Sequence, residues 1–343
     1  MQTTPISQLG EFGLINHLTE NFEAKNKSVI KGVGDDCAVI EKDDEKYFLV
    51  STDILAEGIH FDLVYTPLKH LGYKAVVVNL SDVYAMNGKP LYITVSMALS
   101  SKYTVEAISE IYEGMKVACE KYRVDLIGGD TTSSLKGLFL SITIIGEVAK
   151  EKVVYRNGAK PKDLICVSGD LGAAFMGLQL LEREKQVFIA HPGASTDLEN
   201  QKFLLQRQLK PEARKDIVDI FAEKNIVPTS MIDVSDGLSS ELHHLCKQSN
   251  CGAIIYEDKI PIQSDTYEMA VKMNIDPVTA MMNGGEDYEL LFTISQNDYD
   301  KIKDEPEIRV IGYTTEFANV VELITKGNNK VKIDAAGWKA FNN

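Results

Sequence analysis

KGVGDDCAVI at residues 31–40 leads, after a short acidic loop, into YFLVSTDILAEGIHFD at residues 47–62. Glycines and strand-like apolar runs flank the carboxylates and hydroxyls, which is how proteins usually present oxygen ligands to a hard cation. Acidic loops repel a nucleotide unless divalent cations separate carboxylates from phosphates, so this pattern indicates magnesium-dependent phosphate chemistry. A pair of solvated turns is the alternative, because Gly-Asp-Asp is common in turns. The oxygen-bearing side chains are those of Asp35, Asp36, Ser51, Thr52, Asp53 and Asp62.

Length and charge restrict the class of protein. The 343 residues exceed one comfortable hydrophobic core and predict two domains of roughly 150 residues or a little more. The sequence has 36 basic and 50 acidic residues, and the basic residues form no dense run. This argues against a nucleic acid or an anionic membrane as partner. The start lacks the pattern of a signal peptide, and no apolar run approaches the ~20 residues of a membrane span, so we expect a cytoplasmic protein. The five cysteines form no CxxC pair and support neither a disulfide framework nor a structural zinc site.

Strand and helix patterns alternate along the first half. Thr66 followed by Pro67 predicts a helix N-cap and first helical position. A polar, turn-rich segment at 148–163 is the expected boundary between residues 1–149 and residues 150–343. Strands are expected at 47–55, 92–100, 124–132 and 138–148, and helices at 11–20, 66–86 and 104–122.

Three charged residues near these elements are candidates for binding. Asp82 lies among apolar neighbours on the predicted helix, where burial requires pairing or a metal; an exposed helix face is the alternative. The glycine pair before Asp130 lets the backbone approach a phosphate or nucleobase, although a turn at the end of a strand explains it equally well. Arg156 lies beside a glycine turn and is either a phosphate contact or a surface charge.

The second half contains no GxxxxGK[ST] string, which excludes a P-loop at the level of motif. Asp233, Ser235 and Asp236 lie where a short strand turns into a helix, whose first amides can face an anion. An N-cap is the alternative for Ser235 or Asp236, but it leaves Asp233 unexplained.

Two further candidates lie near the C-terminus. MMNGGEDYELLFTIS at residues 281–295 contains Glu286 and Asp287 between a glycine pair and a strand. Trp338 is the only tryptophan, and its indole can anchor a terminal helix or stack on a cationic ligand.

Seven motifs in this order resemble thiamine-monophosphate kinase, and the resemblance runs from about Gly32 to the C-terminus. It implies the α/β (α+β) fold shared with aminoimidazole ribonucleotide synthetase and selenophosphate synthetase, with two domains of mixed sheets flanked by helices. It also implies a homodimer formed through the first sheet, and transfer of the ATP γ-phosphoryl group to thiamine monophosphate. The motifs are GDDCAVI, STDILAEGIHF, NLSDVYAMNGKP, IGGDTT, YRNGAKPKD, DVSDGLSSEL and GGEDYELLF.

The resemblance also implies a role for individual residues. The acceptor phosphate is already ionised at neutral pH, so no strong general base is expected. For the substrate contact, Glu286 and its neighbour Asp287 remain alternatives. The implied ligands of several Mg²⁺ ions are Asp35, Ser51, Thr52, Asp53, Asp82, Asp130, Asp233 and Asp236. The implied ATP contacts are Tyr112, Gly129, Asp130, Arg156 and Ser235. The implied thiamine monophosphate contacts are His60, Glu286 and Trp338.

Two other functions compete with this interpretation. Another enzyme of the same superfamily would make a different product, but a selenophosphate enzyme is expected to carry a reactive Cys with a Lys in its N-terminal segment. The hydrogenase-maturation relative uses a C-terminal cysteine, whereas this chain ends in FNN. A non-catalytic acidic module that binds Mg²⁺ or Ca²⁺ would contain compact DxDxDG loops, whereas these carboxylates spread from Asp35 to Asp287.

Overall fold

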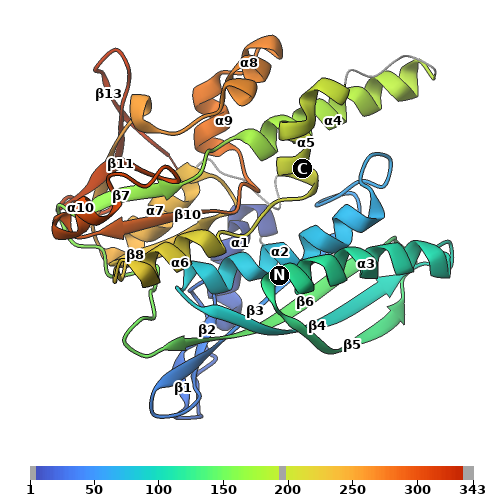
Figure 1. Ribbon diagram of the computed structural model, residues 1–343, viewed down its shortest axis with the longest axis horizontal. Helices are drawn as coiled ribbons and strands as arrows, with labels where there is room; N and C mark the ends of the chain where they lie inside the picture. Colours follow the sequence, from blue (N-terminus) through green and yellow to red (C-terminus); the bar gives the residue numbers. More distant parts are fainter. Residues whose placement is uncertain (1–4, 193–197, 335–343) are drawn as a thin grey trace.

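The computed structural model describes residues 5–192 and 198–334, which build two mixed β-sheets with helices packed on them (Figure 1). The first sheet has the strand order β1-β2-β3-β6-β4-β5. Only β4 and β5 pair in parallel, while the other neighbours are antiparallel. Mixed sheets flanked by helices were expected from the resemblance, and the structure confirms them. The strands are β1 (Val29–Lys31), β2 (Ala38–Glu41), β3 (Lys46–Ala56), β4 (Lys89–Leu99), β5 (Asp125–Ser133) and β6 (Phe139–Ala149).

Helices α2 (Leu68–Ala85) and α3 (Val105–Tyr122) lie together on one face of this sheet (Figure 1). Two glycines allow their close approach, since a Cβ on Gly72 would lie 1.8 Å from Ile111 O and one on Gly114 would lie 1.9 Å from Lys69 O. The predicted start of α2 is one residue early, because Pro67 occupies the N-cap position and makes no side-chain cap. The 3₁₀ turn η1 (Ile6–Gln8) and helix α1 (Gly10–Thr19) precede the sheet.

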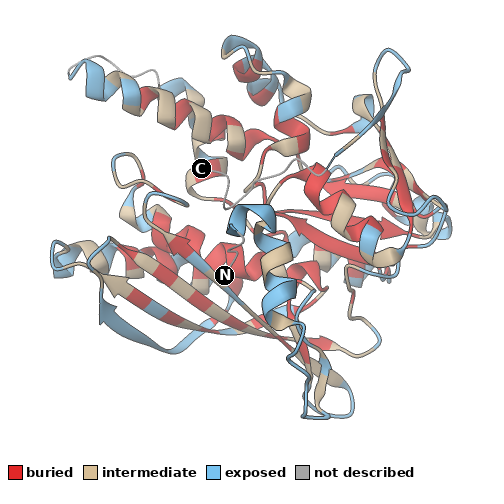
Figure 2. Cartoon of the chain, turned by 180° about the vertical axis from the view of Figure 1, so that it is seen from behind, coloured by how far each residue is buried: buried red, intermediate tan, exposed pale blue. Residues whose placement is uncertain are grey.

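The first sheet carries exposed apolar side chains. Every residue of β5 is exposed, and successive residues of β6 alternate between buried and half-buried (Figure 2). Ile54 on β3 and Leu126 and Ile127 on β5 are about half exposed. Strand β6 therefore keeps the two-residue period of a sheet that is packed on one side, whereas β5 at the edge of the sheet does not.

The second sheet is covered on both faces. Along β10, Leu291 packs into a core with α7, whereas Leu290 and Phe292 pack into another core with Phe221 of α6. This explains the nearly continuous apolar sequence of the strand. The strand order is β13-β12-β9-β11-β7-β10-β8, with β12 and β9 parallel. The strands are β7 (Leu164–Ser168), β8 (Ser230–Val234), β9 (Gly252–Tyr256), β10 (Glu289–Ile294), β11 (Ile308–Thr315), β12 (Val321–Ile324) and β13 (Lys330–Lys332).

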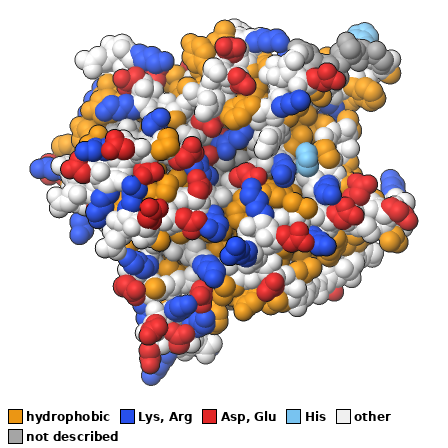
Figure 3. All heavy atoms as spheres, in the orientation of Figure 1, with side chains coloured by type: hydrophobic (Ala, Val, Ile, Leu, Met, Phe, Trp, Pro, Cys, Tyr) orange, Lys and Arg blue, Asp and Glu red, His pale blue; other side chains and the backbone are white. Residues whose placement is uncertain are grey.

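The remaining helices surround this second sheet. No helix within residues 5–192 and 198–334 has the length and apolar character of a membrane span. On the face shown in Figure 3, acidic and basic side chains are interspersed. The α-helices are α4 (Ala173–Ala190), α5 (Lys202–Leu209), α6 (Lys215–Glu223), α7 (Leu238–Ser249), α8 (Ser264–Lys272), α9 (Pro277–Asn283) and α10 (Tyr299–Ile302). The 3₁₀ turns are η2 (Glu199–Gln201), η3 (Glu257–Lys259) and η4 (Gln296–Asp298).

Helix α2 packs between the two sheets. Most of its 18 residues are buried, because one side packs on the first sheet and the other faces the second half of the chain. Ser81 Oγ donates to Asp233 Oδ2 at 2.7 Å, and Tyr73 Oη donates to Glu212 Oε2 at 2.6 Å. Polar groups from both halves therefore meet along this helix.

Candidate active site

Three carboxylates from distant parts of the sequence meet beside α2. Asp36 follows β1, Asp82 lies on α2 and Asp233 lies on β8. One carboxylate oxygen of each lies within 4.8 Å of the others. Three negative charges this close repel one another unless a proton or a cation separates them. The arrangement therefore fits a site for hard cations.

Hydrogen bonds fix the direction of each carboxylate. Ser51 Oγ donates to Asp82 Oδ2 at 2.5 Å, which ties the first sheet to α2. Arg156 donates from Nε and Nη2 to Asp36 Oδ1 at 3.1 and 2.6 Å, and from its backbone N to Asp35 Oδ1 at 3.1 Å. The second oxygens, Asp35 Oδ2 and Asp36 Oδ2, are buried and have no hydrogen-bond partner among the described residues. Such orphaned oxygens are the groups that a metal ion satisfies.

The electrostatics of the site reflect a deficit of positive charge. Burial and the nearby charge of Asp36 raise the pKa of Asp233 to about 7 and the pKa of Asp35 to about 6. Burial and the charge of Asp53 raise the pKa of Asp82 well above its ordinary value. Arg156 is close to this cluster, and Lys31 Nζ lies 3.9 Å from Asp35 Oδ2. These cations do not hold the carboxyl pKa values in their usual range.

Glu11 on α1 adds a further negative charge. Burial and the charge of Glu11 raise the pKa values of Asp53 and Asp236 to about 6. The Phe12 ring lies 4.0 Å from the His244 ring on α7, which docks α1 beside the site. Sequence reasoning missed Glu11, because an acidic residue in the first turn of a helix is ordinary.

Glu241 on α7 is a further buried carboxylate, next to Asp236. Its Oε1 accepts a hydrogen bond from Asp236 N at 2.7 Å, while its buried Oε2 has no partner among the described residues. Ser235 contributes its backbone oxygen, which accepts from Glu286 N at 2.7 Å. The turn at DVSDG thus connects the carboxylate cluster to the GGED segment.

Some of the predicted site residues lie apart from the carboxylate cluster of Asp36, Asp82 and Asp233. Asp53 aligns across β3, β6 and β4 with Gly129 on β5, and three strand spacings amount to about 14 Å. Asp130 follows on β5 and is exposed. Thr52 is also exposed, and its Oγ1 donates to Ile142 O at 3.1 Å.

Tyr112 lies on α3, near the same edge of the sheet. It lines a cavity of about 860 Å³ together with Ile93, Asp125 and Leu126. Within the described residues, Asp36, Asp82 on α2 and Asp233 on β8 therefore lie together. Tyr112 lies beside β5 instead.

His60 lies in the loop that follows β3. Its Nδ1 accepts a hydrogen bond from Ala56 N at 3.0 Å, so the neutral ring carries its proton on Nε2. Burial lowers the pKa of His60 and favours this neutral form. Tyr65 Oη donates to Glu182 at 2.7 Å, and Lys185 Nζ lies 2.7 Å from Asp62 Oδ2, which holds the loop against α4.

Glu286 and Asp287 have different environments. Glu286 has a left-handed φ of 65° and keeps a side chain that is 25% exposed. Asp287 is buried and accepts from Gly172 N at 2.7 Å and Ala174 N at 3.3 Å at the start of α4.

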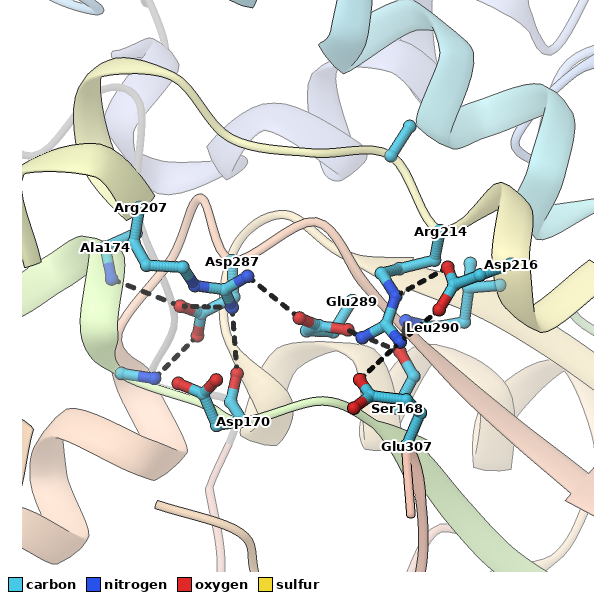
Figure 4. Close-up of polar contacts among 12 residues, drawn as sticks. Ser168, Asp170, Ala174, Arg207, Arg214, Asp216, Asp287, Glu289, Leu290 and Glu307 are labelled. Carbon is cyan, nitrogen blue, oxygen red and sulfur yellow. Dashed lines mark hydrogen bonds and ion pairs between the residues drawn. The ribbon is translucent and has the colours of Figure 1, made fainter. Parts of the chain in front are cut away.

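Asp287 also belongs to a buried ionic network beneath the site (Figure 4). Arg207 Nη2 lies 3.8 Å from Asp287 Oδ1, and Arg207 Nη1 lies 2.9 Å from Glu289 Oε1. Arg214 Nη1 pairs with the other oxygen of Glu289, which also accepts from Ser168 Oγ. Asp287 is thus committed to the architecture, whereas the side chain of Glu286 is partly exposed. Trp338 lies outside the described residues.

Sequence comparison relates these features to known proteins. AIR synthase related protein, N-terminal domain, matches residues 34–148, and AIR synthase related protein, C-terminal domain, matches residues 163–324. Thiamine-monophosphate kinase of Bacillus subtilis (strain 168) is 33% identical over 97% of this chain and 100% of the relative. The enzyme of Aquifex aeolicus (strain VF5) is 34% identical over 98% of this chain and 99% of the relative. The chain belongs to the thiamine-monophosphate kinase family.

Solved structures agree with membership of the thiamine-monophosphate kinase family. AaThiL complexed with AMPPCP and TMP has a TM-score of 0.84 at 32% identity, over 99% of this chain and 100% of that chain. Hydrogenase maturation protein HypE in complex with ATP has a TM-score of 0.69 at 17% identity, which shows a shared fold alone. The resemblance stated from the motifs is therefore confirmed.

Proposed function

We propose that this chain transfers the γ-phosphoryl group of ATP to the phosphate of thiamine monophosphate and so makes thiamine diphosphate. Similarity to thiamine-monophosphate kinases over nearly the whole chain supports this activity, and AaThiL was solved with AMPPCP and TMP. The observation that carries the proposal is the cluster of Asp36, Asp82 and Asp233, which suits cations of the kind that accompany a nucleotide triphosphate.

We propose that several Mg²⁺ ions are these cations. The orphaned oxygens of Asp35 and Asp36 and the all-oxygen donor set suit a hard cation. When bound, Mg²⁺ would neutralise phosphate charge and align donor and acceptor for in-line transfer. Asp36 joins the set because its carboxylate lies in the cluster. The other ligands that we propose are Asp35, Ser51, Thr52, Asp53, Asp82, Asp130, Asp233 and Asp236.

The protein's own part in the reaction is to orient charged groups. Arg156 uses Nε and Nη2 on Asp36, which leaves Nη1 to face a nucleotide phosphate. Ser51 and Ser81 hold Asp82 and Asp233 in fixed directions. Because the acceptor phosphate is already ionised, no side chain has to remove a proton from it.

The nucleotide contacts that we propose extend from the cluster toward β5. The cavity beside Tyr112 can hold the adenine, because an aromatic ring and apolar side chains line it. Gly129 has no side chain to obstruct an approaching phosphate. The proposed ATP contacts are Tyr112, Gly129, Asp130, Arg156 and Ser235.

For the thiamine phosphate we propose His60, Glu286 and Trp338. Neutral His60 offers its Nε2 proton, and Glu286 keeps a partly exposed carboxylate for the cationic thiazolium. Asp287 is the less suitable alternative, because its side chain is fully buried while it holds α4 and Arg207.

We also propose a cytoplasmic homodimer with domains at 1–149 and 150–343. The exposed apolar residues Ile54, Leu126 and Ile127 favour the first sheet as the contact surface. All five cysteines are free thiols, which suits a reducing compartment that contains ATP. Analytical ultracentrifugation tests the dimer, and a monomer at assay concentrations would contradict it.

A product assay tests the function. Purified protein with Mg²⁺, ATP and thiamine monophosphate should form thiamine diphosphate. Unphosphorylated thiamine and an excess of chelator serve as controls, and neither should give this product. Nucleotide binding without thiamine diphosphate formation would retain the fold and exclude the proposed acceptor.

A further inference from the structure

A buried lysine joins the two halves of the chain at Glu286. Lys74 on α2 has a side chain that is 3% exposed, and its Nζ lies 2.7 Å from Glu286 Oε1. It also donates to Gln208 O at 3.3 Å, while Gln208 Nε2 donates to Glu286 Oε2 at 2.7 Å. Both oxygens of Glu286 are therefore held from two directions.

A purely structural role explains this pair poorly. Removing an ammonium and a carboxylate from water is costly, so a buried ion pair adds little stability compared with apolar packing. Glu286 also has a φ of 65°, a region that glycine adopts far more easily. Strained backbone of this kind clusters at ligand sites, where the surrounding structure enforces it. An apolar residue at position 74 and a glycine at position 286 would serve the fold better.

The environment of Lys74 indicates a ligand with opposite charges. Its ammonium has three donors, and the contacts to Glu286 and Gln208 use two within the described residues. Burial lowers the pKa of His60, while the charge of Glu286 raises it and the charge of Lys74 lowers it. Thiamine monophosphate carries an anionic phosphate and a cationic thiazolium. An adjacent ammonium and carboxylate are the electrostatic complement of such a molecule.

We propose that Lys74 is a specificity residue that selects the phosphorylated substrate. Its ammonium attracts the acceptor phosphate and lies beside Glu286, the proposed partner of the thiazolium, so that charges alternate from phosphate to Lys74, Glu286 and thiazolium. This inference rests on the proposed kinase function. It assigns discrimination between thiamine monophosphate and thiamine to a residue outside the carboxylate cluster.

The test compares Lys74→Met with Lys69→Met in titration calorimetry. Lys69 lies on the same helix, but it is exposed and pairs with Glu113 at the surface. We expect Lys74→Met to weaken binding of thiamine monophosphate by about 10- to 100-fold, the usual effect of a lost charged hydrogen bond, and to leave thiamine binding within about twofold. Lys69→Met should bind both ligands like the wild type. Equal weakening of both ligands, or no change, would overturn the proposal.

Two further variants distinguish a role of Lys74 in selecting the monophosphate from the mere loss of the Lys74–Glu286 ion pair. Glu286→Gln should weaken thiamine and thiamine monophosphate by similar factors, because it removes the partner of the ring. If Lys74→Met does not fold, Lys74→Met with Glu286→Gln removes both charges and leaves none unpaired. That double variant should lose about 10-fold or more of the preference for the monophosphate; retention of the wild-type preference would refute the role of Lys74. The product assay on the wild type is run first, so failure of the kinase function is recognised independently.

Discussion

Arg156 donates two hydrogen bonds to a single oxygen of Asp36, with Nε at 3.1 Å and Nη2 at 2.6 Å, and the other oxygen of Asp36 is buried without a hydrogen-bond partner among the described residues. The arginine thus neutralises one member of the cluster without occupying its centre. We expect Arg156→Met to lower the free energy of unfolding by about 3 kcal/mol in chelator at neutral pH, because Asp36 is left buried without its partner.

Urea denaturation measures this change. Lys42→Met is the control, because Lys42 pairs with Glu147 at the surface and its loss should cost much less than the loss of Arg156. Equal losses in the two variants would contradict the neutralising role of Arg156.

The pKa of Asp233 predicts how its contribution to stability changes with pH. Its pKa of about 7 in the folded protein lies above the ordinary value of 3.8. The folded state therefore binds the proton more tightly, and stability contributed by protonated Asp233 is lost as pH rises through about 7. Without metal, Asp233→Asn should gain stability over the wild type as pH rises from about 4 to about 7, by a few kcal/mol.

Chemical denaturation in chelator at both ends of that range gives the difference directly. The comparison between variants removes the opposing effect of histidines such as His60 and His244, whose pKa values are lowered by burial. A stability difference that is constant with pH would contradict the raised pKa.

Loss of one bridging carboxylate should impair turnover more than folding. Asp130 is exposed, so Asp130→Asn should change the free energy of unfolding by less than about 0.5 kcal/mol. We expect both Asp130→Asn and Asp233→Asn to lose about 100-fold or more in kcat, since aligned charge neutralisation supplies most of the catalysis. Steady-state kinetics at saturating ATP test this, and near wild-type turnover in either variant would remove that residue from the ligand set.

Glu289 should affect stability without affecting chemistry. It is buried and pairs with both Arg207 and Arg214, so Glu289→Gln leaves two buried guanidinium groups with less compensation (Figure 4). We expect a loss of about 3 kcal/mol in the free energy of unfolding and little change in the kcat of the folded enzyme. Glu307→Gln, at an exposed partner of Arg214, should cost less than about 1 kcal/mol. A similar cost for both variants would contradict the network.

Local patterns in the sequence predicted the elements of the first half well. The strand at 138–148 has a two-residue apolar period and corresponds to β6, and the helix at 66–86 corresponds to α2. Such signals depend only on neighbouring residues, so they require no knowledge of the rest of the fold. The exact N-cap of α2 was harder to predict from the sequence, because Thr66 is a residue type that often caps helices, whereas the structure has Pro67 at that position.

The candidate site could be predicted only in part. The motifs contained Asp82 and Asp233, but their proximity depends on how α2 packs between the sheets. Lys74 was missed because a lysine on a helix usually faces water, and only tertiary packing buries it against Glu286. The resemblance selected Asp35, whereas its neighbour Asp36 lies in the three-carboxylate cluster. Adjacent residues with the same chemistry cannot be distinguished without the backbone direction.

The burial of α2 on two sides has a consequence for unfolding. If the first half of the chain existed alone, the side of α2 that now meets Asp233, Glu212 and Glu286 would be exposed to water. The second half alone would lose the surface on which these groups pack. We therefore expect a single calorimetric transition for the whole chain, because neither half retains its stability after the other has melted.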